Sequence, residues 1–329
     1  MVPFLGEELP SALRENKLKL HNVDDKLHLD YQGQLWPINQ KGKDLILDAL
    51  DDTQADELNS KLEKLSTNHQ FLQQILDVQY YRLCCYNETS SQINYRRFFT
   101  VNSLICMNMD DEQVFETYHS YINQLVRKGI FQGLRIDHVD GLADPETYLQ
   151  RLRNLVGNDI YIVVEKILEK DETFETRWPV QGTTGYEFLS LANNLLTTRK
   201  TESDFDAIYH EQIGKEIDVK QLAYEKKKEI LFGHMLGELA HLVELFKELE
   251  LIDQENLQTL DDHELKNAIA EFLILCPVYR LYINKAPIGE QDFNVLSDII
   301  DQVISNQDNE KAGAILREVL GYLKSDNPK

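Results

Sequence analysis

The chain has 329 residues, with 34 Lys and Arg against 56 Asp and Glu, so its formal net charge is −22, and 42% of its residues are hydrophobic. This composition supplies enough apolar material for a substantial core and excludes a wholly disordered chain. The acidity excludes nucleic acid and an anionic membrane surface as the main partner, because phosphate binding requires clustered Lys and Arg.

The N-terminal part is predicted to contain short strands followed by helices. Residues 26–36 alternate apolar and polar side chains around Gln32 and Gly33, which is typical of a β-hairpin. Leucine and isoleucine recur at helical spacing through residues 43–86. We therefore expect residues 1–42 to form a short β and turn segment that precedes a helical region.

The centre of the chain alternates helices and strands. An amphipathic helix is predicted over residues 110–128, followed by a strand at 133–139, a helix at 145–156 and an apolar strand at 159–167. Gly129 is well placed to end the first of these helices. A strand, a helix and a second strand in close succession indicate a βαβ unit, the building block of a parallel sheet or barrel.

The chain after residue 185 is predicted to be almost wholly helical. Long apolar stripes run through residues 217–250 and 262–282, which indicates a helical subdomain at the C-terminal end. The lysine run at 226–228 is typical of a solvated helix face and not of a binding patch.

The cysteines and the N-terminal segment indicate the compartment. Four cysteines are present without metal-ligand spacing, and such thiols are typical of a reducing cytoplasm. The first residues lack the basic and apolar regions of a secretory signal, and no apolar run approaches the roughly 18 residues of a membrane span. We predict a cytoplasmic protein with no metal site and no membrane partner.

Two acidic residues follow apolar strands directly. Asp137 comes after the strand residues 133–136, and Glu165 after residues 160–164. In a (β/α)₈ barrel the carboxyl ends of consecutive strands meet at one rim and build the active site. Paired carboxylates about 5–5.5 Å apart are the geometry of a retaining glycosidase. Arg135, two residues before Asp137, is expected to lie on the same side and to hold that carboxylate charged. The alternative is that each acid merely ends a strand and caps the turn that follows.

The segment 133–142 (GLRIDHVDGL) resembles the nucleophile region of the α-amylase superfamily (glycoside hydrolase family 13), and more narrowly that of the maltooligosyl trehalose synthases. Other segments match this family in the same order along the chain, and the resemblance is strongest over residues 80–200. They are Val2–Gly6 (VPFLG), Ile93–Phe99 (INYRRFF), Val163–Leu168 (VVEKIL), Trp178–Val180 (WPV) and Gly182–Phe188 (GTTGYEF).

The resemblance implies a role for individual residues. Asp137 matches the catalytic nucleophile and Glu165 matches the general acid and base. The matching substrate-binding residues are Arg135, His138, Tyr95, Arg96, Arg97 and Lys166. For Tyr95, Trp178 and Tyr186, packing in the core is an equally good interpretation as contact with sugar.

The implied reaction is an intramolecular transglucosylation in trehalose biosynthesis. The reducing-end α-1,4 linkage of a maltooligosaccharide is converted to an α,α-1,1 linkage by a retaining mechanism with two carboxylates, without metal or organic cofactor. Two alternatives stay open: hydrolysis of α-glucan by the same carboxylates, and a non-catalytic glucan-binding role.

The chain departs from the family pattern in ways that bear on activity. The resemblance implies a third carboxylate after a His, but residues after 200 hold no such segment, and Asp261–Glu264 (DDHE) has the wrong order. The histidine segment that the family carries upstream is missing as well. We therefore expect an internal piece of a longer protein that is inactive by itself.

The predicted elements and these departures together indicate the fold class and whether chains associate. We predict an α/β chain that is helix-rich overall, with a partial (β/α)₈ barrel and a large helical insertion. The expected segments are 1–42 (β and turn), 43–200 (partial barrel) and 201–329 (helical subdomain). An incomplete barrel leaves sheet edges exposed, so either the remaining helices cover them or chains associate with one another through them.

Overall fold

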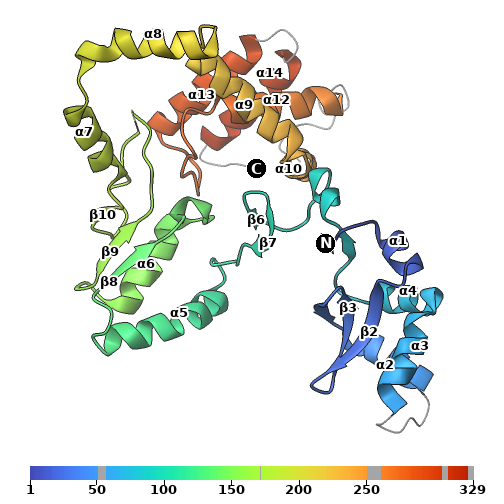
Figure 1. Ribbon diagram of the computed structural model, residues 1–329. Coiled ribbons are helices and arrows are strands. Elements are labelled where there is room, and N and C mark those ends of the chain that lie inside the picture. Colours follow the sequence, from blue (N-terminus) through green and yellow to red (C-terminus); the bar gives the residue numbers. More distant parts are fainter. Residues whose placement is uncertain (51–56, 171, 250–260, 306–309, 325–329) are drawn as a thin grey trace. The chain divides into compact units, whose positions relative to one another are not determined.

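The computed structural model describes residues 1–50, 57–170, 172–249, 261–305 and 310–324, and the chain divides into two compact units. Unit 1 comprises residues 1–106 and 232–242, and unit 2 comprises residues 107–231 and 243–329. Figure 1 shows the elements along the chain. The three segments expected from the sequence are a different division, and they stay a prediction about domain organisation.

The strands of unit 1 form small sheets around a leucine-rich core. Tyr31 pairs with Gln34 across Gln32 and Gly33, which both have positive φ (54° and 87°), so the hairpin predicted at this position is confirmed. The first strand pairs in parallel with the fifth, the second to fourth form an antiparallel meander, and the last two pair antiparallel. The strands are β1 (Val2–Leu5), β2 (Leu18–Val23), β3 (Lys26–Tyr31), β4 (Gln34–Pro37), β5 (Leu83–Cys85), β6 (Arg97–Phe98) and β7 (Val101–Ile105).

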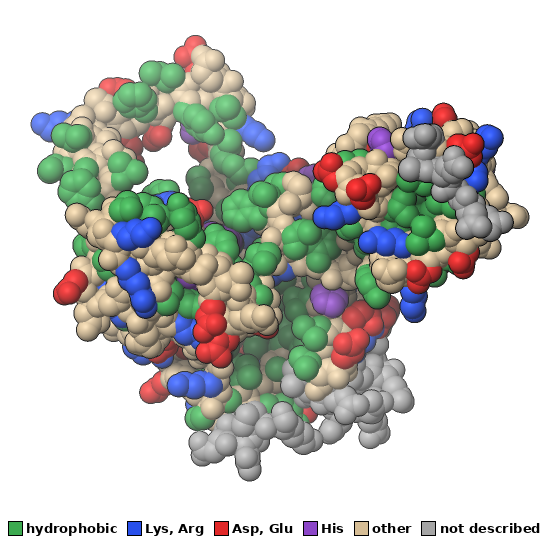
Figure 2. All heavy atoms as spheres, turned by 90° about the horizontal axis from the view of Figure 1, so that it is seen from below, with side chains coloured by type: hydrophobic (Ala, Val, Ile, Leu, Met, Phe, Trp, Pro, Cys, Tyr) green, Lys and Arg blue, Asp and Glu red, His purple; other side chains and the backbone are tan. Residues whose placement is uncertain are grey.

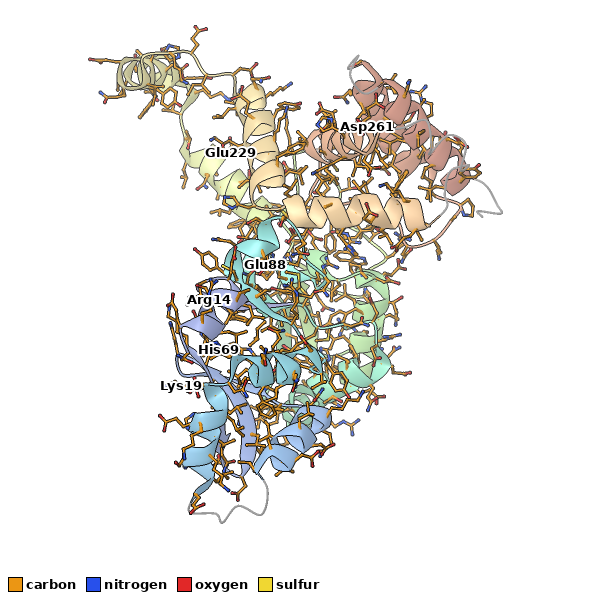
Figure 3. The ribbon with its side chains drawn as sticks, turned by 90° about the vertical axis from the view of Figure 1, so that its right-hand side faces the viewer. Arg14, Lys19, His69, Glu88, Glu229 and Asp261 are labelled. Atoms are coloured by element: carbon orange, nitrogen blue, oxygen red, sulfur yellow. The ribbon has the colours of Figure 1, made fainter. Side chains whose placement is uncertain are left out.

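Short helices cover the core of unit 1. Three of them fall largely in the region 43–86, where helical periodicity predicts them, whereas the helix Leu9–Arg14 lies in the segment expected to be β and turn. Buried Ser66 accepts a hydrogen bond from the Leu20 amide at 2.8 Å, which fastens the end of one helix to the meander. His69 begins the next helix beside Asn68, whose side chain caps it, and Figure 3 labels His69 and Lys19 on these elements. The helices are α1 (Leu9–Arg14), α2 (Gln40–Leu50), α3 (Leu58–Ser66), α4 (His69–Asp77) and the 3₁₀ helix η2 (Tyr86–Ser90).

Unit 2 contains the predicted βαβ arrangement. The strands β8 (Gly133–Ile136), β9 (Tyr161–Val164) and β10 (Gly182–Thr183) run parallel in the order β10-β9-β8. Helices α5 (Glu112–Arg127) and α6 (Pro145–Val156) belong to the same hydrophobic cluster, which includes fully buried Leu149, Leu152 and Ile162. The strands before and after α6, β8 and β9, therefore pack against the same apolar core.

Local signals explain where these two helices begin and end. The Asp111 side chain accepts a hydrogen bond from the Val114 amide, and the Asp144 side chain accepts one from the Thr147 amide ahead of Pro145. After α5 the chain turns at Gly129, whose φ is +69°. The sequence-based predictions of both helices are confirmed.

The described part of the chain after residue 185 is mainly helical, as predicted. The helical stripe predicted through residue 282 is wrong for residues 276–282: the helix that begins at Asp262 ends at Leu275, because Pro277 disfavours a helical backbone at Cys276, and residues 276–289 are irregular. The helices are α7 (Tyr186–Leu196), α8 (Glu202–Ile213), α9 (Val219–Gly233), α10 (Leu236–Glu248), α12 (Asp262–Leu275), α13 (Glu290–Ser305) and α14 (Glu310–Lys324), with the 3₁₀ helix η4 (Arg199–Thr201) between the first two. The last three helices share a buried core around Ala268, Ile300 and Val303.

The helix-rich character expected from the sequence is confirmed, whereas the sheets are small. Within the described ranges no sheet has more than three strands, so the partial barrel stays a proposal. None of the residues of α7 is buried. On the face of the molecule drawn in Figure 2, apolar side chains are interspersed with charged ones. No helix in the described part of the chain has both the length and the apolar character of a membrane span.

His119 is a buried titratable residue in the core of unit 2. It lies on α5, is 2% exposed, and its ring nitrogens lie 2.8 Å from the Phe115 carbonyl oxygen and 2.9 Å from the Tyr148 hydroxyl. Burial lowers the pKa of His119, and it raises the pKa of Tyr148 to about 12. The sequence had given no indication of a role for His119, and the structure places it in the core.

We expect unit 2 to lose stability as the pH falls below the ordinary pKa of histidine, about 6.5. The unfolded chain takes up a proton at that pH, whereas folded His119 stays neutral until its lowered pKa is reached, so this stabilisation is lost between the two values. Urea unfolding followed by Trp178 fluorescence at pH 7.5 and 5.5, in a Trp36→Phe background so that only unit 2 is reported, measures the difference. His119→Gln should reduce the pH dependence, and His210→Gln on exposed α8 should leave it unchanged; equal pH dependence in all three proteins would contradict the prediction.

Candidate active site

The two predicted catalytic carboxylates lie at the same edge of the parallel sheet. Ile136, the last residue of β8, pairs with Val164, the last residue of β9. Asp137 and Glu165 directly follow these two residues. The Glu165 backbone amide donates a hydrogen bond to the Ile136 carbonyl at 2.7 Å, so the backbone pairing of the two strands continues to Glu165. The parallel pairing therefore brings together two residues that are 28 positions apart, as the strand pattern indicated.

The Arg135 guanidinium lies between these carboxylates. Its Nη1 donates to Asp137 Oδ1 at 2.5 Å, and its Nη2 lies 4.0 Å from Glu165 Oε1. Asp137 and Arg135 are more than half exposed, whereas the Glu165 side chain is only 26% exposed. The expected pairing of Arg135 with Asp137 is present, and the same cation also faces the second acid.

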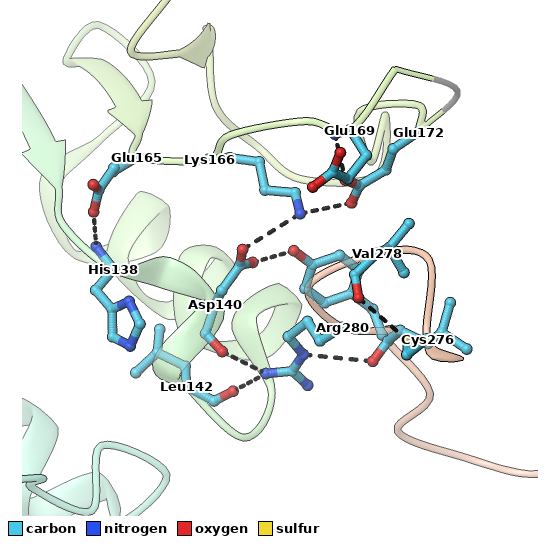
Figure 4. Close-up of polar contacts among 12 residues, drawn as sticks. His138, Asp140, Leu142, Glu165, Lys166, Glu169, Glu172, Cys276, Val278 and Arg280 are labelled. Carbon is cyan, nitrogen blue, oxygen red and sulfur yellow. Dashed lines mark hydrogen bonds and ion pairs between the residues drawn. The ribbon is translucent and has the colours of Figure 1, made fainter. Parts of the chain in front are cut away.

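His138 has an uncommon backbone conformation next to the carboxylates. Its φ and ψ are 49° and 46°, in the left-handed region that residues with a side chain seldom adopt, and its amide donates to Glu165 Oε2 at 2.7 Å. A Cβ on Gly141 would lie 2.3 Å from His138 Cδ2, so only glycine at position 141 leaves room for this ring. The backbone turn thus directs a donor at one oxygen of Glu165 (Figure 4).

Lys166, which the resemblance implies as a substrate-binding residue, is buried in this structure. Its side chain is 2% exposed, and its ammonium lies 3.3 Å from Asp140 Oδ2 and 2.6 Å from Glu172 Oε1 (Figure 4). The ammonium therefore compensates two largely buried carboxylates, Asp140 and Glu172. The contact of Lys166 with substrate stays a prediction.

The structure adds two residues to this network that the sequence did not single out. The Tyr282 hydroxyl donates to Asp140 Oδ1, and Arg280 donates from Nη1 to the Asp140 carbonyl at 3.0 Å. Burial raises the pKa of Tyr282 well above its ordinary value, and the hydrogen bond to Asp140 adds to the shift. The sequence signal was weak: at 279–282 (YRLY) one Arg stands between two tyrosines, outside the segments that match the family.

Three further predicted substrate-binding residues lie in unit 1. Arg97 is buried, with its Nε 2.9 Å from Glu238 Oε1 and its Nη1 2.5 Å from Asn102 Oδ1. The Tyr95 hydroxyl donates to the Asn102 carbonyl at 3.2 Å, and burial raises the pKa of this tyrosine. Arg96 is exposed. Asp137 and Glu165 belong to unit 2, so the substrate-binding role of these three residues stays a prediction.

Like Tyr95, the aromatic residues Trp178 and Tyr186 are predicted either to pack in the core or to contact sugar. Trp178 is 5% exposed and packs edge-on against Phe174 and Tyr282, with ring centroids 5.6 and 5.0 Å apart, so it belongs to the core of unit 2. Tyr186 begins α7 and is partly exposed. The structure therefore assigns Trp178 a packing role.

The acidic run at 261–264 has a local function in the structure. Asp261, labelled in Figure 3, accepts a hydrogen bond from the His263 amide, and its own amide donates to Glu264, both at 3.3 Å. This is the capping box of α12, in line with the sequence reading that set this run apart from a catalytic segment. Across the described ranges, no group of three or more His, Cys, Asp or Glu side chains is arranged to hold a metal ion.

Known proteins similar to this chain are maltooligosyl trehalose synthases. A segment of 132 residues, 40% of this chain, is 40% identical to a Mycobacterium tuberculosis (strain H37Rv) protein assigned as a maltooligosyl trehalose synthase, and it covers 17% of that protein. No family model matches the chain.

Solved structures agree over almost the whole chain. A glycosyltrehalose synthase of strain DSM5389 superposes with a TM-score of 0.72 and 28% identity, and the maltooligosyltrehalose synthase of Arthrobacter ramosus with 0.69 and 25%. A Sulfolobus tokodaii protein assigned as a maltooligosyl trehalose synthase gives 0.67 and 30%. Each match covers 98% of this chain but only 37–39% of the other protein. The family resemblance read from the motifs is confirmed, and the chain spans less than two fifths of these structures.

Proposed function

We propose that this chain carries the nucleophile and the general acid and base of a retaining enzyme that converts maltooligosaccharides to maltooligosyl trehalose. The observation that carries the proposal is the Arg135 guanidinium, which faces both strand-end carboxylates at 2.5 and 4.0 Å. The similarity to maltooligosyl trehalose synthases supports the substrate class, a neutral α-1,4-glucan. A neutral sugar also fits the net charge of −22.

The chemistry follows from the positions of the two acids. Asp137, the more exposed carboxylate and the one closest to Arg135, attacks the anomeric carbon and forms a covalent glycosyl ester. Glu165 gives its proton to the glycosidic oxygen of the released glucose. That glucose turns over in place, Glu165 takes the proton from its anomeric hydroxyl, and the hydroxyl displaces Asp137. Two inversions retain the α configuration, and exclusion of water favours isomerisation over hydrolysis.

We also propose that β8, β9 and β10 with α5 and α6 are part of a (β/α)₈ barrel. The support is the parallel strand order, the helix between two of the strands and the acids at their carboxyl ends. We place the chain in the cytoplasm, because its four cysteines are free thiols.

A cationic sugar analogue tests the carboxylate pair without requiring turnover. The ammonium of 1-deoxynojirimycin imitates the positive charge that develops at the sugar ring in the transition state. Asp137→Asn removes one negative charge and should weaken its binding at least tenfold, whereas binding of neutral maltotriose should change less than about threefold. Isothermal titration measures both. Asp159→Asn is the matched control, because Asp159 is exposed and precedes β9 at its opposite end.

The outcomes separate the three candidate functions. If wild type binds neither sugar, the proposal fails for this chain. If wild type and Asp137→Asn bind each of the two sugars equally well, the chain is a non-catalytic glucan-binding protein. With maltopentaose, isomerisation lowers the number of reducing ends and hydrolysis raises it. We expect neither from the chain by itself, because the third carboxylate implied by the resemblance has no matching segment after residue 200.

A further inference from the structure

We propose that Arg280 and Tyr282 are positioning residues for the candidate catalytic centre, which they influence by holding the loop of residues 138–143. The catalytic meaning of this inference rests on the proposed function, whereas the mechanical coupling does not. Both residues lie in the irregular segment 276–289, about 140 positions after the loop, and all of these residues belong to unit 2.

Arg280 binds the loop through its backbone. Its Nη1 donates to the carbonyls of Asp140, at 3.0 Å, and Leu142 (Figure 4). Its Nη2 donates to the Ala143 carbonyl at 3.2 Å. The guanidinium is a rigid planar fork, so one side chain fixes three carbonyl directions together. The Tyr282 ring lies 5.0 Å from the guanidinium carbon and supports it by a cation–π contact.

Tyr282 and Lys166 bind the same loop through the Asp140 side chain. The Tyr282 hydroxyl donates to one carboxylate oxygen, and the Lys166 ammonium lies 3.3 Å from the other. Lys166 directly follows Glu165, and Asp140 lies three positions after Asp137. One partly buried network therefore fixes the chain directly after both candidate catalytic acids.

The loop needs this support because of His138. A residue with a side chain stays in the left-handed region only where its surroundings determine the conformation, and the φ of His138 is 49°. In this conformation its amide donates to Glu165 Oε2 at 2.7 Å. If the loop relaxes, that amide turns away and Glu165 loses the donor that orients its carboxyl group. Arg280 and Tyr282 thus act on Glu165 through the backbone of the loop.

Amide hydrogen exchange of His138, measured by NMR on the whole chain, tests the coupling directly. Arg280→Ala removes three charge-assisted hydrogen bonds and should speed the exchange of this amide at least tenfold, and Tyr282→Phe, which removes only a hydroxyl, by about threefold. The amides of Ile162 and Val164 in β9 should keep their exchange rates. Arg280→Lys keeps the charge but not the fork, so it should be intermediate. Arg177→Ala is the matched control, because Arg177 pairs with Glu146 and Glu175 in the same unit without reaching the loop.

The results separate a positioning role from a general structural one. Faster exchange confined to the loop of residues 138–143 supports the proposal. Unchanged exchange at His138, or a rise no larger than that in β9, overturns it. If wild type binds 1-deoxynojirimycin, Arg280→Ala should also weaken this binding several-fold. If wild type does not bind it, the proposed function fails, and the exchange measurement still decides whether the loop is held by these residues.

Discussion

Replacement of Lys166 by methionine is expected to lower the free energy of unfolding of unit 2 by about 3–5 kcal/mol. The ammonium is 2% exposed and lies between Asp140 and Glu172, whose side chains are 11% and 10% exposed. Methionine fills a similar volume but leaves two buried carboxylates without a counter-charge, and an uncompensated buried charge is more costly than the original pair. Urea unfolding monitored by Trp178 fluorescence measures the loss, in a Trp36→Phe background because these are the two tryptophans of the chain.

Two further variants show whether burial is the cause. Lys226→Met removes an equivalent ammonium that is 64% exposed and pairs with Glu229, and it should change stability by less than about 0.5 kcal/mol. Glu172→Gln added to Lys166→Met removes one of the stranded charges and should recover part of the loss. A loss below about 1 kcal/mol for Lys166→Met, or no recovery in the double variant, would contradict the expectation.

The sequence predicts well those features that depend on neighbouring residues. The hairpin at Gln32 and Gly33 and the end of α5 at Gly129 each depend on a few consecutive residues, and both are present. The positions of Asp137 and Glu165 at one sheet edge are predictable for a similar reason. Parallel pairing of two apolar strands determines which ends meet, whatever the rest of the chain does.

Strand alternation also predicts that the Lys166 side chain is buried. Ile162 and Val164 are both fully buried, and side chains alternate along a strand, so Lys166 continues the core-facing side while Glu165 takes the other. The same rule places Arg135 and Asp137 together on one side of β8. It indicates a buried role for Lys166, where the family resemblance implies a contact with substrate.

The remainder of the site depends on contacts between distant segments. Arg280 and Tyr282 meet Asp140 across about 140 positions, and Arg97 meets Glu238 across 141. Periodicity assigns each residue to a face of its own element, but it does not say which segment packs against that face. Long-range polar pairs of this kind became apparent only with the structure.

Arg97 gives the second large expected effect, a loss of about 3–5 kcal/mol in the stability of unit 1 when it is replaced by methionine. Its side chain is 4% exposed and donates to Glu238 Oε1, Asn102 Oδ1 and the Thr89 hydroxyl at 2.9, 2.5 and 3.2 Å. Glu238 lies in the segment 232–242, so this pair joins a distant helix to the first 106 residues of the chain. Its loss leaves a partly buried carboxylate and two polar groups without their donor.

Unfolding of unit 1, followed by Trp36 fluorescence in a Trp178→Phe background, measures this effect in the absence of sugar. Arg97→Lys should recover little, because an ammonium does not reproduce the planar fork that reaches several acceptors. Arg82→Met is the control, since the Arg82 side chain is 52% exposed and pairs with Glu88 alone among the described ion pairs; its loss should stay below about 1 kcal/mol. A guanidinium already bound to this many acceptors has to release some of them to hold a sugar. Full stability of Arg97→Met, accompanied by weaker maltotriose binding, would therefore contradict the structural role and favour the predicted contact with substrate.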